Sequence, residues 1–437
     1  MIIDSIKEID TTNLYQGYTY SYPHKSAYRA IEKTSLATIW AKEQMKRLFF
    51  YVHIPFCEMR CGFCNLFTMA NPKEGVRHYI EALKREMDTY KGLFPEARFT
   101  NFAIGGGTPT FLEIDEFQLL LEYISAMGVD MATYYGSIET SPKTLTKEKI
   151  VLIENAGITR VSMGIQSWIE TETKSLGRPQ SISKAETIVS QLASSAIPEF
   201  NLDLIYGAKD QDKKSFLYSI EKTLAYQPTE VFLYPLYVRQ LTGLGKKNRD
   251  TEDHRHELYL LGRDILLTAG YEQMSMRCFR KKNSPISTIT DAYNSLTDGM
   301  IGIGAGARSY TKELHYSTDY AVDRKVIKNI ISNYSHTDDF NTISYGIALN
   351  DWEQKTRFVI KSVTDGGKLS HQLYQTLFGT DVFQEFEILQ VLLDKEWLEK
   401  EQENYTLSLK GMCYEDIIGP ALYSDDVKSL MKNYIWR

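Results

Sequence analysis

The sequence predicts an α/β fold in which a parallel sheet curls into a partial or full (β/α) barrel, followed by a small α-rich C-terminal domain. The first observation is a recurring unit, in which a strand-like apolar run precedes a short polar or glycine-rich segment and then a helix-like stretch. This alternation favours a parallel sheet with right-handed crossovers. The second is that several runs are continuously apolar, as strands buried on both faces are. A doubly wound open sheet is the alternative arrangement.

Each expected element has a local signal. The strand-like runs are residues 49–54, 100–105, 135–140, 159–165, 200–207 and 230–236. Apolar residues at helical spacing predict amphipathic helices over residues 76–90, 115–127, 145–156, 182–195, 213–225 and 253–268. Asp115 is expected to cap the second of these helices, and Gly128 is expected to follow its last turn.

The length of 437 residues predicts more than one domain. Residues 1–48 precede the first strand and form a tyrosine-rich N-terminal extension. Residues 49–322 carry the strand–helix alternation and are assigned to the barrel. Residues 323–437 are expected to form a helical C-terminal domain, with a short strand pair near 396–408.

The composition indicates a globular protein without a membrane span. Hydrophobic residues make up 43% and charged residues 24% of the chain, and the net charge is −6. The acidic balance gives no electrostatic signature of a nucleic-acid partner. No apolar run reaches the roughly 18–20 residues that a membrane helix needs, and the N-terminus lacks a signal core. Five cysteines form no disulfide framework, so we expect a cytoplasmic protein. Separately, we expect a monomer.

The segment after the first strand carries a cysteine cluster. Cys57, Cys61 and Cys64 have the spacing Cys-x3-Cys-x2-Cys. Three thiolates suit three corners of a [4Fe–4S] cluster and leave the fourth iron open for a ligand. A structural zinc site or an electron-transfer cluster would need a fourth ligand. The nearest candidate, His53, is expected within the strand as a packing residue.

Polar residues mark the carboxyl ends of the later strands. A glycine segment, Gly105–Thr110, ends the second strand and would bring backbone N–H groups close to a ligand, but it lacks the GK[ST] ending of a P-loop. Glu139 ends the third strand and Gln166 the fourth. Arg178 and Asp203 follow, and a polar ligand at this face would explain them. A structural salt bridge between Arg178 and Asp203 is the alternative.

These motifs resemble the radical S-adenosylmethionine (SAM) superfamily. In those enzymes SAM chelates the open iron, and one electron cleaves it to methionine and a 5′-deoxyadenosyl radical, which abstracts hydrogen from the substrate. The segment from Tyr51 to Cys57, reading YVHIPFC, is similar to the branch of oxygen-independent coproporphyrinogen III oxidase. That branch also contains haem chaperones and methyltransferases with two SAM sites. The resemblance covers roughly residues 15–430.

The resemblance implies a site for each residue of the matching motifs. The cluster would be held by Cys57, Cys61 and Cys64. One SAM is implied, and a second is allowed. The first would lie near Tyr51, Gly106, Glu139 and Arg308. The second would lie near Phe63, Gly107, Thr108, Gln166, Arg178, Asp203 and Pro235.

The resemblance leaves three functions open. Oxidative decarboxylation of a porphyrinogen propionate is the first, although Leu66 replaces an additional cysteine of the oxidase. Radical methyl transfer to a peptide-derived or other natural product is the second. A haem chaperone is the third, although its His-Asn-x-x-Tyr-Trp motif is missing. The implied partners are a small-molecule substrate and an electron donor. Cys278 and Cys413 are expected to be small buried hydrophobic residues.

Overall fold

A computed structural model describes residues 9–72, 74–129, 135–239, 241–245, 253–282, 284, 293–364 and 366–436 of the chain. A curved sheet lies at the centre, and neighbouring strands of its middle part run parallel. These strands are β12 (Met300–Ile303), β2 (Leu48–Ile54), β5 (Phe99–Gly106), β6 (Tyr135–Thr140), β7 (Arg160–Gln166), β8 (Glu199–Tyr206) and β9 (Glu230–Pro235).

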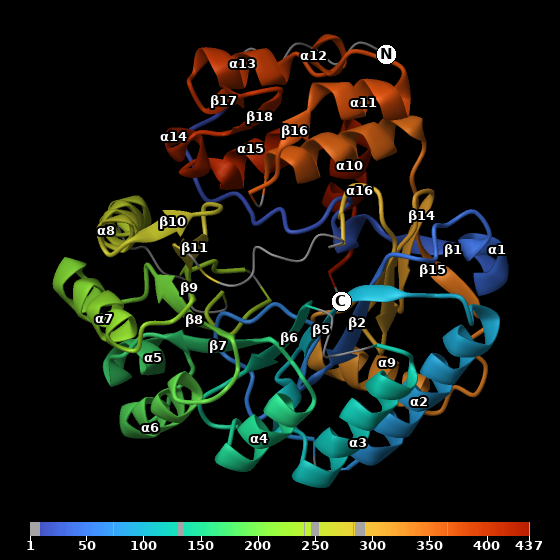
Figure 1. The fold of residues 1–437 in the computed structure, drawn as a ribbon, viewed down its shortest axis with the longest axis horizontal. Helices are drawn as coiled ribbons and strands as arrows, with labels where there is room; N and C mark the ends of the chain where they lie inside the picture. The colour runs from blue at the N-terminus through green and yellow to red at the C-terminus, as the bar shows by residue number, and fades with distance from the viewer. Residues whose placement is uncertain are drawn as a thin grey trace.

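Helices follow these strands and cover the outer side of the sheet (Figure 1). They are α2 (Val76–Leu93), α3 (Ile114–Ala126), α4 (Lys147–Asn155), α5 (Glu170–Ser175), α6 (Ile182–Ala193), α7 (Lys213–Ala225) and α8 (Arg255–Thr268). Their buried faces carry the apolar residues that the periodicity indicates, for example Tyr79, Ile80, Leu83 and Met87 on α2. The helix over 114–126 begins one residue earlier than predicted. Its N-cap is Glu113 and not Asp115, because Glu113 forms a reciprocal capping box with Glu116.

The strand order distinguishes the two arrangements that the sequence allows. From β2 to β9 the parallel strands lie side by side in chain order, with no switch point. A doubly wound sheet reverses its order and carries helices on both faces, so that alternative is wrong. The sheet ends in two edge strands, so it forms a partial and not a closed barrel.

Antiparallel strands extend the sheet at both ends. Beyond β9 lie β11 (Cys278–Lys281) and β10 (Tyr271–Gln273). Beyond β12 lie β13 (Arg308–Tyr310), β14 (Leu314–Ser317), β15 (Thr342–Ala348) and β1 (Arg29–Ser35). Helix α1 (Leu36–Trp40) follows β1, and α9 (Arg324–Ser335) packs against α2. Strand β1 thus joins the part of the chain before the barrel to its sheet, and β15 joins the part after it.

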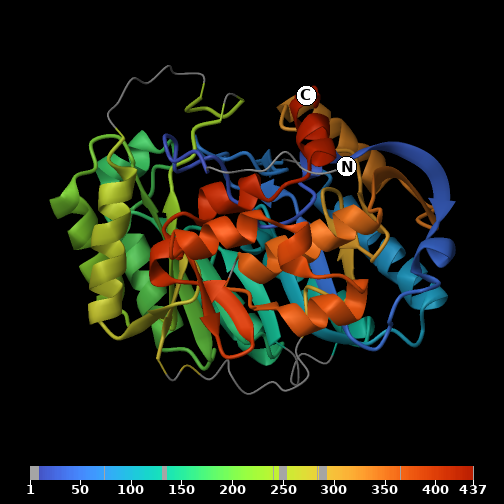
Figure 2. The ribbon, with the colours of Figure 1, turned by 90° about the horizontal axis from the view of Figure 1, so that it is seen from above.

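The C-terminal helices lie across the molecule from α2, α3 and α4, and Figure 2 shows them in front of the sheet. They have a core of their own, which also includes Tyr22 and Ala27 of the N-terminal extension. The expected strand pair near 396–408 is β17 (Leu398–Glu401) and β18 (Asn404–Leu407), joined by β16 (Leu369–Ser370). The helices are α10 (Asp351–Val363), α11 (His371–Phe378), α12 (Val382–Glu385), α13 (Ile388–Asp394), α14 (Leu409–Met412), α15 (Glu415–Ala421) and α16 (Asp425–Lys432). The domain limits at 48 and 322 remain a prediction.

No described helix is both long and apolar enough to cross a membrane.

A buried ion pair joins the C-terminal helices to the barrel, and it supplies the first prediction. Asp416 on α15 pairs with Arg277 and accepts a hydrogen bond from Tyr237, and both charged residues are at most 2% exposed. Replacing Asp416 with Asn leaves Arg277 buried without a charge partner. We expect the free energy of unfolding to fall by about 3–5 kcal/mol, measured by urea denaturation.

Asp264→Asn is the matched control. Asp264 lies 2.7 Å from Arg263, but its side chain is 62% exposed. An exposed pair contributes about 1 kcal/mol or less. Equal losses for the two variants would contradict the assigned role of the buried pair.

Candidate active site

The cysteine loop is tied down at several points. Strand β3 (Phe56–Cys57) pairs with β4 (Met69–Ala70), which closes the loop on itself. The N–H of Gly62 donates to the carbonyl of Leu176 at 3.0 Å, and the carbonyl of Gly62 accepts from Leu244 at 2.8 Å. A Cβ at position 62 would stand 2.7 Å from the Leu176 oxygen, so only glycine fits there. The loop is therefore held against the segments that follow α5 and β9.

The three thiols of the loop border one cavity of about 260 Å³ at the carboxyl ends of the parallel strands. Burial raises the pKa of Cys57 to about 12 and also raises the pKa of Cys61, so thiolates here need a cationic partner. The Thr108 hydroxyl donates to the Cys57 sulfur at 3.6 Å. A cluster bound at these sulfurs would supply the missing positive charge.

The donor set suits a cluster better than a single ion. No three His, Cys, Asp or Glu side chains of the described residues converge on one point as ligands of one metal ion must. The thiolates of a [4Fe–4S] cluster bind different iron atoms, so they need to face a common space and not a common point. Cys57, Cys61 and Cys64 meet that condition, and the cavity beside them leaves room for a further ligand.

Glu139 of β6 faces the same cavity from the second strand along the sheet. The backbone N–H of Gly106 donates to its carboxylate at 3.0 Å. Burial in the barrel raises the pKa of Glu139, although this hydrogen bond opposes the shift. The side chain is nevertheless accessible, because it borders the cavity. A fixed, accessible carboxylate at this place suits an ammonium group of a ligand.

The glycine segment acts differently from the sequence-based expectation. The N–H of Gly106 is taken by Glu139, and the N–H of Gly107 donates to the carbonyl of Ile54 at 2.8 Å. The expectation that these N–H groups face a ligand is therefore wrong. The glycines instead permit close packing, since a Cβ at Gly106 would stand 2.5 Å from the His53 ring. At Gly106 the φ angle of +108° also favours glycine.

Gln166 and Arg178 form the wall opposite the glycine segment. Gln166 ends β7 with a φ of +70°, next to a register shift between β7 and β8. Non-glycine residues adopt this conformation at a cost of about 1 kcal/mol or more, and such positions cluster at functional sites. Gly164 makes room for both side chains, because a Cβ there would lie 2.5 Å from Gln166 and 3.0 Å from Arg178.

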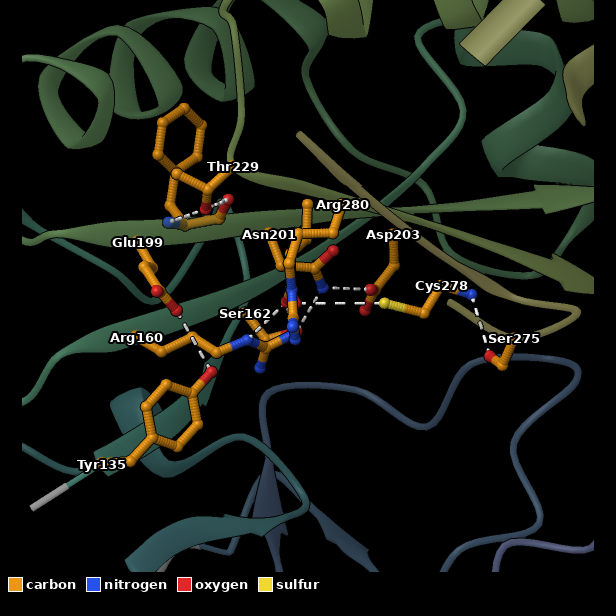
Figure 3. Close-up of polar contacts among 12 residues, drawn as sticks. Tyr135, Arg160, Ser162, Glu199, Asn201, Asp203, Thr229, Ser275, Cys278 and Arg280 are labelled. Carbon is orange, nitrogen blue, oxygen red and sulfur yellow. Dashed lines mark hydrogen bonds and ion pairs between the residues drawn. The ribbon is translucent and has the colours of Figure 1, made fainter. Parts of the chain in front are cut away.

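Asp203 lies beside them on β8 and borders the cavity. Asn201, which is 1% exposed, donates from Nδ2 to Asp203 at 2.6 Å and to the Ser162 hydroxyl at 2.7 Å (Figure 3). Burial raises the pKa of Asp203 to about 7. Within the described part of the chain, Arg178 and Asp203 form no ion pair within 4.0 Å, so the salt-bridge alternative is wrong and both side chains face the cavity.

A network of paired charges fills the barrel below this level. Arg160 and Arg280 both pair with Glu230, at 2.7 and 2.8 Å. Tyr135 donates to Glu199 at 3.2 Å, and Figure 3 shows these two residues beside Arg160. These paired charges fill the amino end of the lumen. The polar residues that line the cavity, such as Glu139 and Asp203, lie toward the carboxyl end of the strands.

His53 is a packing residue in the structure, as predicted. It is 6% exposed, and its Nε2 lies 3.1 Å from the Phe67 carbonyl while Nδ1 lies 3.1 Å from the Tyr51 hydroxyl. The carbonyl only accepts, so Nε2 carries the proton and Nδ1 accepts from Tyr51. Burial lowers the pKa of His53 to about 4. Neither ring nitrogen is available to a haem iron.

Most of the residues expected at the site line one cavity. They are Cys57, Cys61, Phe63, Cys64, Gly106, Gly107, Thr108, Glu139, Gln166, Arg178 and Asp203. Tyr51, Pro235 and Arg308 are not among its lining residues. Tyr51 forms a hydrogen bond with His53, whose ring packs against Gly106 of the cavity wall. Arg308 donates to Ser21 at 2.7 Å.

Tyr234 was missed by the sequence analysis. It borders the cavity, whereas the next residue, Pro235, is buried away from it. The alternation of β9 contains the signal, because Val231 and Leu233 are buried and Phe232 and Tyr234 are partly accessible. The same period on β8 places Asp203 in the lumen. Lys143 and Glu58 were also missed, and they form an ion pair at the edge of the cavity.

The fold and the cysteine site together define a class of protein. Residues 51–222 match the model of the radical SAM superfamily, so the chain contains a radical SAM domain. The superfamily implies a [4Fe–4S] cluster and SAM, and the thiols at the cavity fit that requirement.

The individual proteins to which the chain is similar include oxidases and heme chaperones. The chain is 27% identical over 277 residues to an oxygen-independent coproporphyrinogen III oxidase of Paracoccus denitrificans, covering 59% of this chain and 61% of that enzyme. It is 28% identical over 264 residues to the heme chaperone HemW of Escherichia coli, covering 59% of this chain and 68% of HemW. The chain thus spans less than two thirds of the first relative.

A solved structure has the same fold over nearly the whole chain. Coproporphyrinogen III oxidase (HemN) of Escherichia coli, a radical SAM enzyme, matches with a TM-score of 0.77 over 96% of this chain and 97% of that one. The sequence identity is 18%, so this likeness concerns the fold.

The cluster assignment gives the second prediction. Cys64→Ala removes one of the three sulfurs at the cavity, so we expect the reconstituted protein to lose most of its iron and SAM cleavage. Iron and sulfide analysis with the visible absorbance of the cluster measures the loss. Cys413→Ala changes a buried thiol in the helical region and should retain both. A full iron complement in Cys64→Ala would refute the assignment.

The raised pKa of Asp203 gives the third prediction. Its folded pKa is about 7, against an ordinary value of about 3.9. The cost of the buried charge is absent below pH ~4, grows as pH rises to ~7, and is complete above that. Cluster-free Asp203→Asn should therefore gain stability over the wild type across this window, by an order of 2 kcal/mol after allowance for the open cavity.

Urea denaturation at about pH 4.5 and pH 7.5 measures the difference. Glu199 also has a pKa raised to about 7, by burial, but its contribution is common to both proteins and cancels. Asp210→Asn, at an exposed position after β8, is the control variant. A pH-independent gain for Asp203→Asn would show that the charge is not penalised.

Proposed function

We propose that this chain is a radical SAM enzyme that resembles oxygen-independent coproporphyrinogen III oxidase and acts on a porphyrinogen propionate or a related substrate. The observation that carries this proposal is the single cavity in which three thiols, the accessible Glu139 carboxylate and the Gln166–Arg178–Asp203 wall face one another. When bound, a [4Fe–4S] cluster supplies the electron that cleaves SAM and releases a 5′-deoxyadenosyl radical. Cys57, Cys61 and Cys64 hold it.

The protein residues bind and orient SAM. Glu139 is held by the Gly106 N–H, so its second carboxylate oxygen is free for the SAM amino group or ribose. Glycine at 106 and 107 keeps the backbone of the adjoining strand close to the cysteine loop, since a Cβ at 107 would stand 3.0 Å from the Cys57 sulfur. The cysteine loop and the Glu139 carboxylate therefore border the same space, in which SAM would be held between them.

Gln166, Arg178 and Asp203 support a second ligand in the same cavity. Arg178 and Asp203 form no ion pair with any described residue. A cation and a titratable carboxyl at this wall suit the carboxylate and hydroxyl groups of a second SAM. If a second SAM binds, methyl transfer becomes the second candidate function. In the oxidase reaction the radical instead takes a hydrogen atom from the propionate side chain. An external acceptor then takes an electron as carbon dioxide leaves and the vinyl group forms.

The fourth prediction separates these reactions. The reconstituted protein is incubated anaerobically with SAM and dithionite, with and without coproporphyrinogen III. We expect the porphyrinogen to accelerate 5′-deoxyadenosine formation and to lose carbon dioxide, with no S-adenosylhomocysteine. Chromatography with mass detection measures all three products.

Other outcomes lead to other functions. If the porphyrinogen does not change the rate of 5′-deoxyadenosine formation, the radical chemistry stands and coproporphyrinogen III is excluded as the substrate. S-Adenosylhomocysteine would favour methyl transfer. No deoxyadenosine from a fully loaded cluster would favour a haem-binding protein, the function that the HemW relatives represent. Glu139→Gln is the matched variant, since it keeps the shape of the side chain and removes the charge that orients SAM.

A further inference from the structure

Lys25 and Arg308 are two partly buried cations that lie near each other. Lys25 lies in the short helix η1 (Lys25–Ala27), with its Nζ 4.3 Å from the centre of the Tyr320 ring. The Arg308 guanidinium lies 4.8 Å from the Tyr20 ring and donates to the Ser21 hydroxyl at 2.7 Å. Among the described residues, no Asp or Glu comes within 4.0 Å of either cation. Their partners are aromatic rings and the hydroxyl groups of Ser21, Tyr20 and Tyr320.

Other interior cations have partners of two kinds: Lys149 donates to two backbone carbonyls, and three arginines pair with carboxylates. Arg277 pairs with Asp416, and Arg160 and Arg280 pair with Glu230. Burying a cation without an anion is costly, and proteins usually pair such groups or bind a ligand with them. The unpaired state of Lys25 and Arg308 therefore points to an anion that is not part of the chain.

The neighbouring groups respond to the same positive potential. Burial, together with the charges of Lys25, Arg308 and Arg239, lowers the pKa of His24 to about 3, so this imidazole is neutral. Burial alone would raise the pKa of Tyr20, but Lys25 and Arg308 outweigh it and the pKa is lowered. His24 adds no compensating negative charge, and Tyr20 does so only as a phenolate.

Two aromatic contacts connect the cations to the active-site cavity. Tyr20 packs against Tyr18 with ring centres 5.5 Å apart, and Tyr18 packs against Tyr234 of the cavity wall at 6.4 Å. A ligand that extends from the cavity past Tyr234 would meet Tyr18 and then the cation pair. The N-terminal extension thus supplies Lys25 and Ser21, and β13 supplies Arg308.

We infer that Lys25, Arg308 and Ser21 form a subsite that binds a carboxylate of the substrate while the reacting carbon lies in the cavity. This inference rests on the proposed function, since it assigns a position to the substrate of that site. The Arg308 fork suits a carboxylate in two-point contact, and Lys25 adds a point charge. The carboxylate has two sources, the substrate and the methionine part of SAM, which the experiment distinguishes.

The test uses the reconstituted holoenzyme and Lys25→Met. Coproporphyrin III, the stable oxidised form, is titrated as the free acid and as the full methyl ester, and its fluorescence is followed. We expect Lys25→Met to weaken binding of the acid about tenfold and to leave the ester unchanged, because only the acid carries the anion. Lys25→Arg should restore most of the affinity. Lys33→Met, at an exposed lysine of β1, is the matched control.

A second probe is independent of porphyrins. Trimesate, a simple tricarboxylate, is added at constant ionic strength, and the melting temperature is measured. We expect stabilisation of the wild type and Lys33→Met that is reduced in Lys25→Met. Equal stabilisation of all proteins would overturn the subsite. Failure of the wild type to bind porphyrin, with the trimesate difference retained, would reject the proposed substrate and keep the subsite.

The concentration of SAM that gives half-maximal uncoupled cleavage settles the source of the carboxylate. We expect no change in Lys25→Met. A tenfold increase there, with unaltered porphyrin binding, would assign the cations to SAM and overturn the inference.

Discussion

The side-chain alternation of the parallel strands is the constraint on which the rest of the structure depends. One set of residues on each strand faces the helices and must be apolar, and the other set faces the lumen. On β8 Leu202 and Leu204 are fully buried under helices, while Asn201 and Asp203 face inward. The lumen of a barrel is narrow and walled by protein, so every polar group placed there needs a partner or a ligand.

The lumen meets this requirement differently at its two ends. Toward the amino end, Arg160, Glu230 and Arg280 satisfy one another. Toward the carboxyl end, Glu139 keeps one hydrogen bond to the chain, and Gln166 holds an unfavourable backbone conformation to face the cavity. Paired charges thus fill the amino end. The groups above them, which form no ion pair within the described part of the chain, line the cavity where we propose that ligands bind. Stability and function are separated along the barrel axis, as is usual for this architecture.

The sequence predicted the strands well, because burial on both faces leaves a continuous apolar run. Every predicted strand of the barrel agrees with the structure to within one residue at each end. It did not predict that β1 and β15 would pair, since their residues lie more than 300 positions apart and antiparallel edge strands carry a weak pattern. Asp115 was chosen as a cap from residue type alone, whereas Glu113 and Glu116 together satisfy the free N–H groups of the helix.

The site was predictable where the residue type dictates the chemistry. Three cysteines at close spacing have few uses, so their common cavity could be predicted from the chain. The glycine segment was harder, because a glycine serves equally to expose an N–H or to admit a neighbour. Here the His53 ring occupies the space beside Gly106, and the Ile54 carbonyl accepts the hydrogen bond from the Gly107 N–H. Tyr234 could not be predicted from its own strand alone. The alternation along β9 says which residues share a face, but the position of Asp203 on β8 is needed to tell which face is the lumen.

The N-terminal extension and the C-terminal helices contact the barrel near its cavity through charged as well as apolar side chains. Arg277 of the barrel binds Asp416 of the C-terminal helices and lies 3.9 Å from the ring of Tyr18 in the N-terminal extension. Tyr18 in turn contacts Tyr234 at the cavity wall. A cation held by a buried carboxylate keeps its position, and so does the aromatic ring stacked on it. Asp416 of the C-terminal helices therefore fixes Arg277, and Arg277 holds Tyr18 against Tyr234 of the cavity wall.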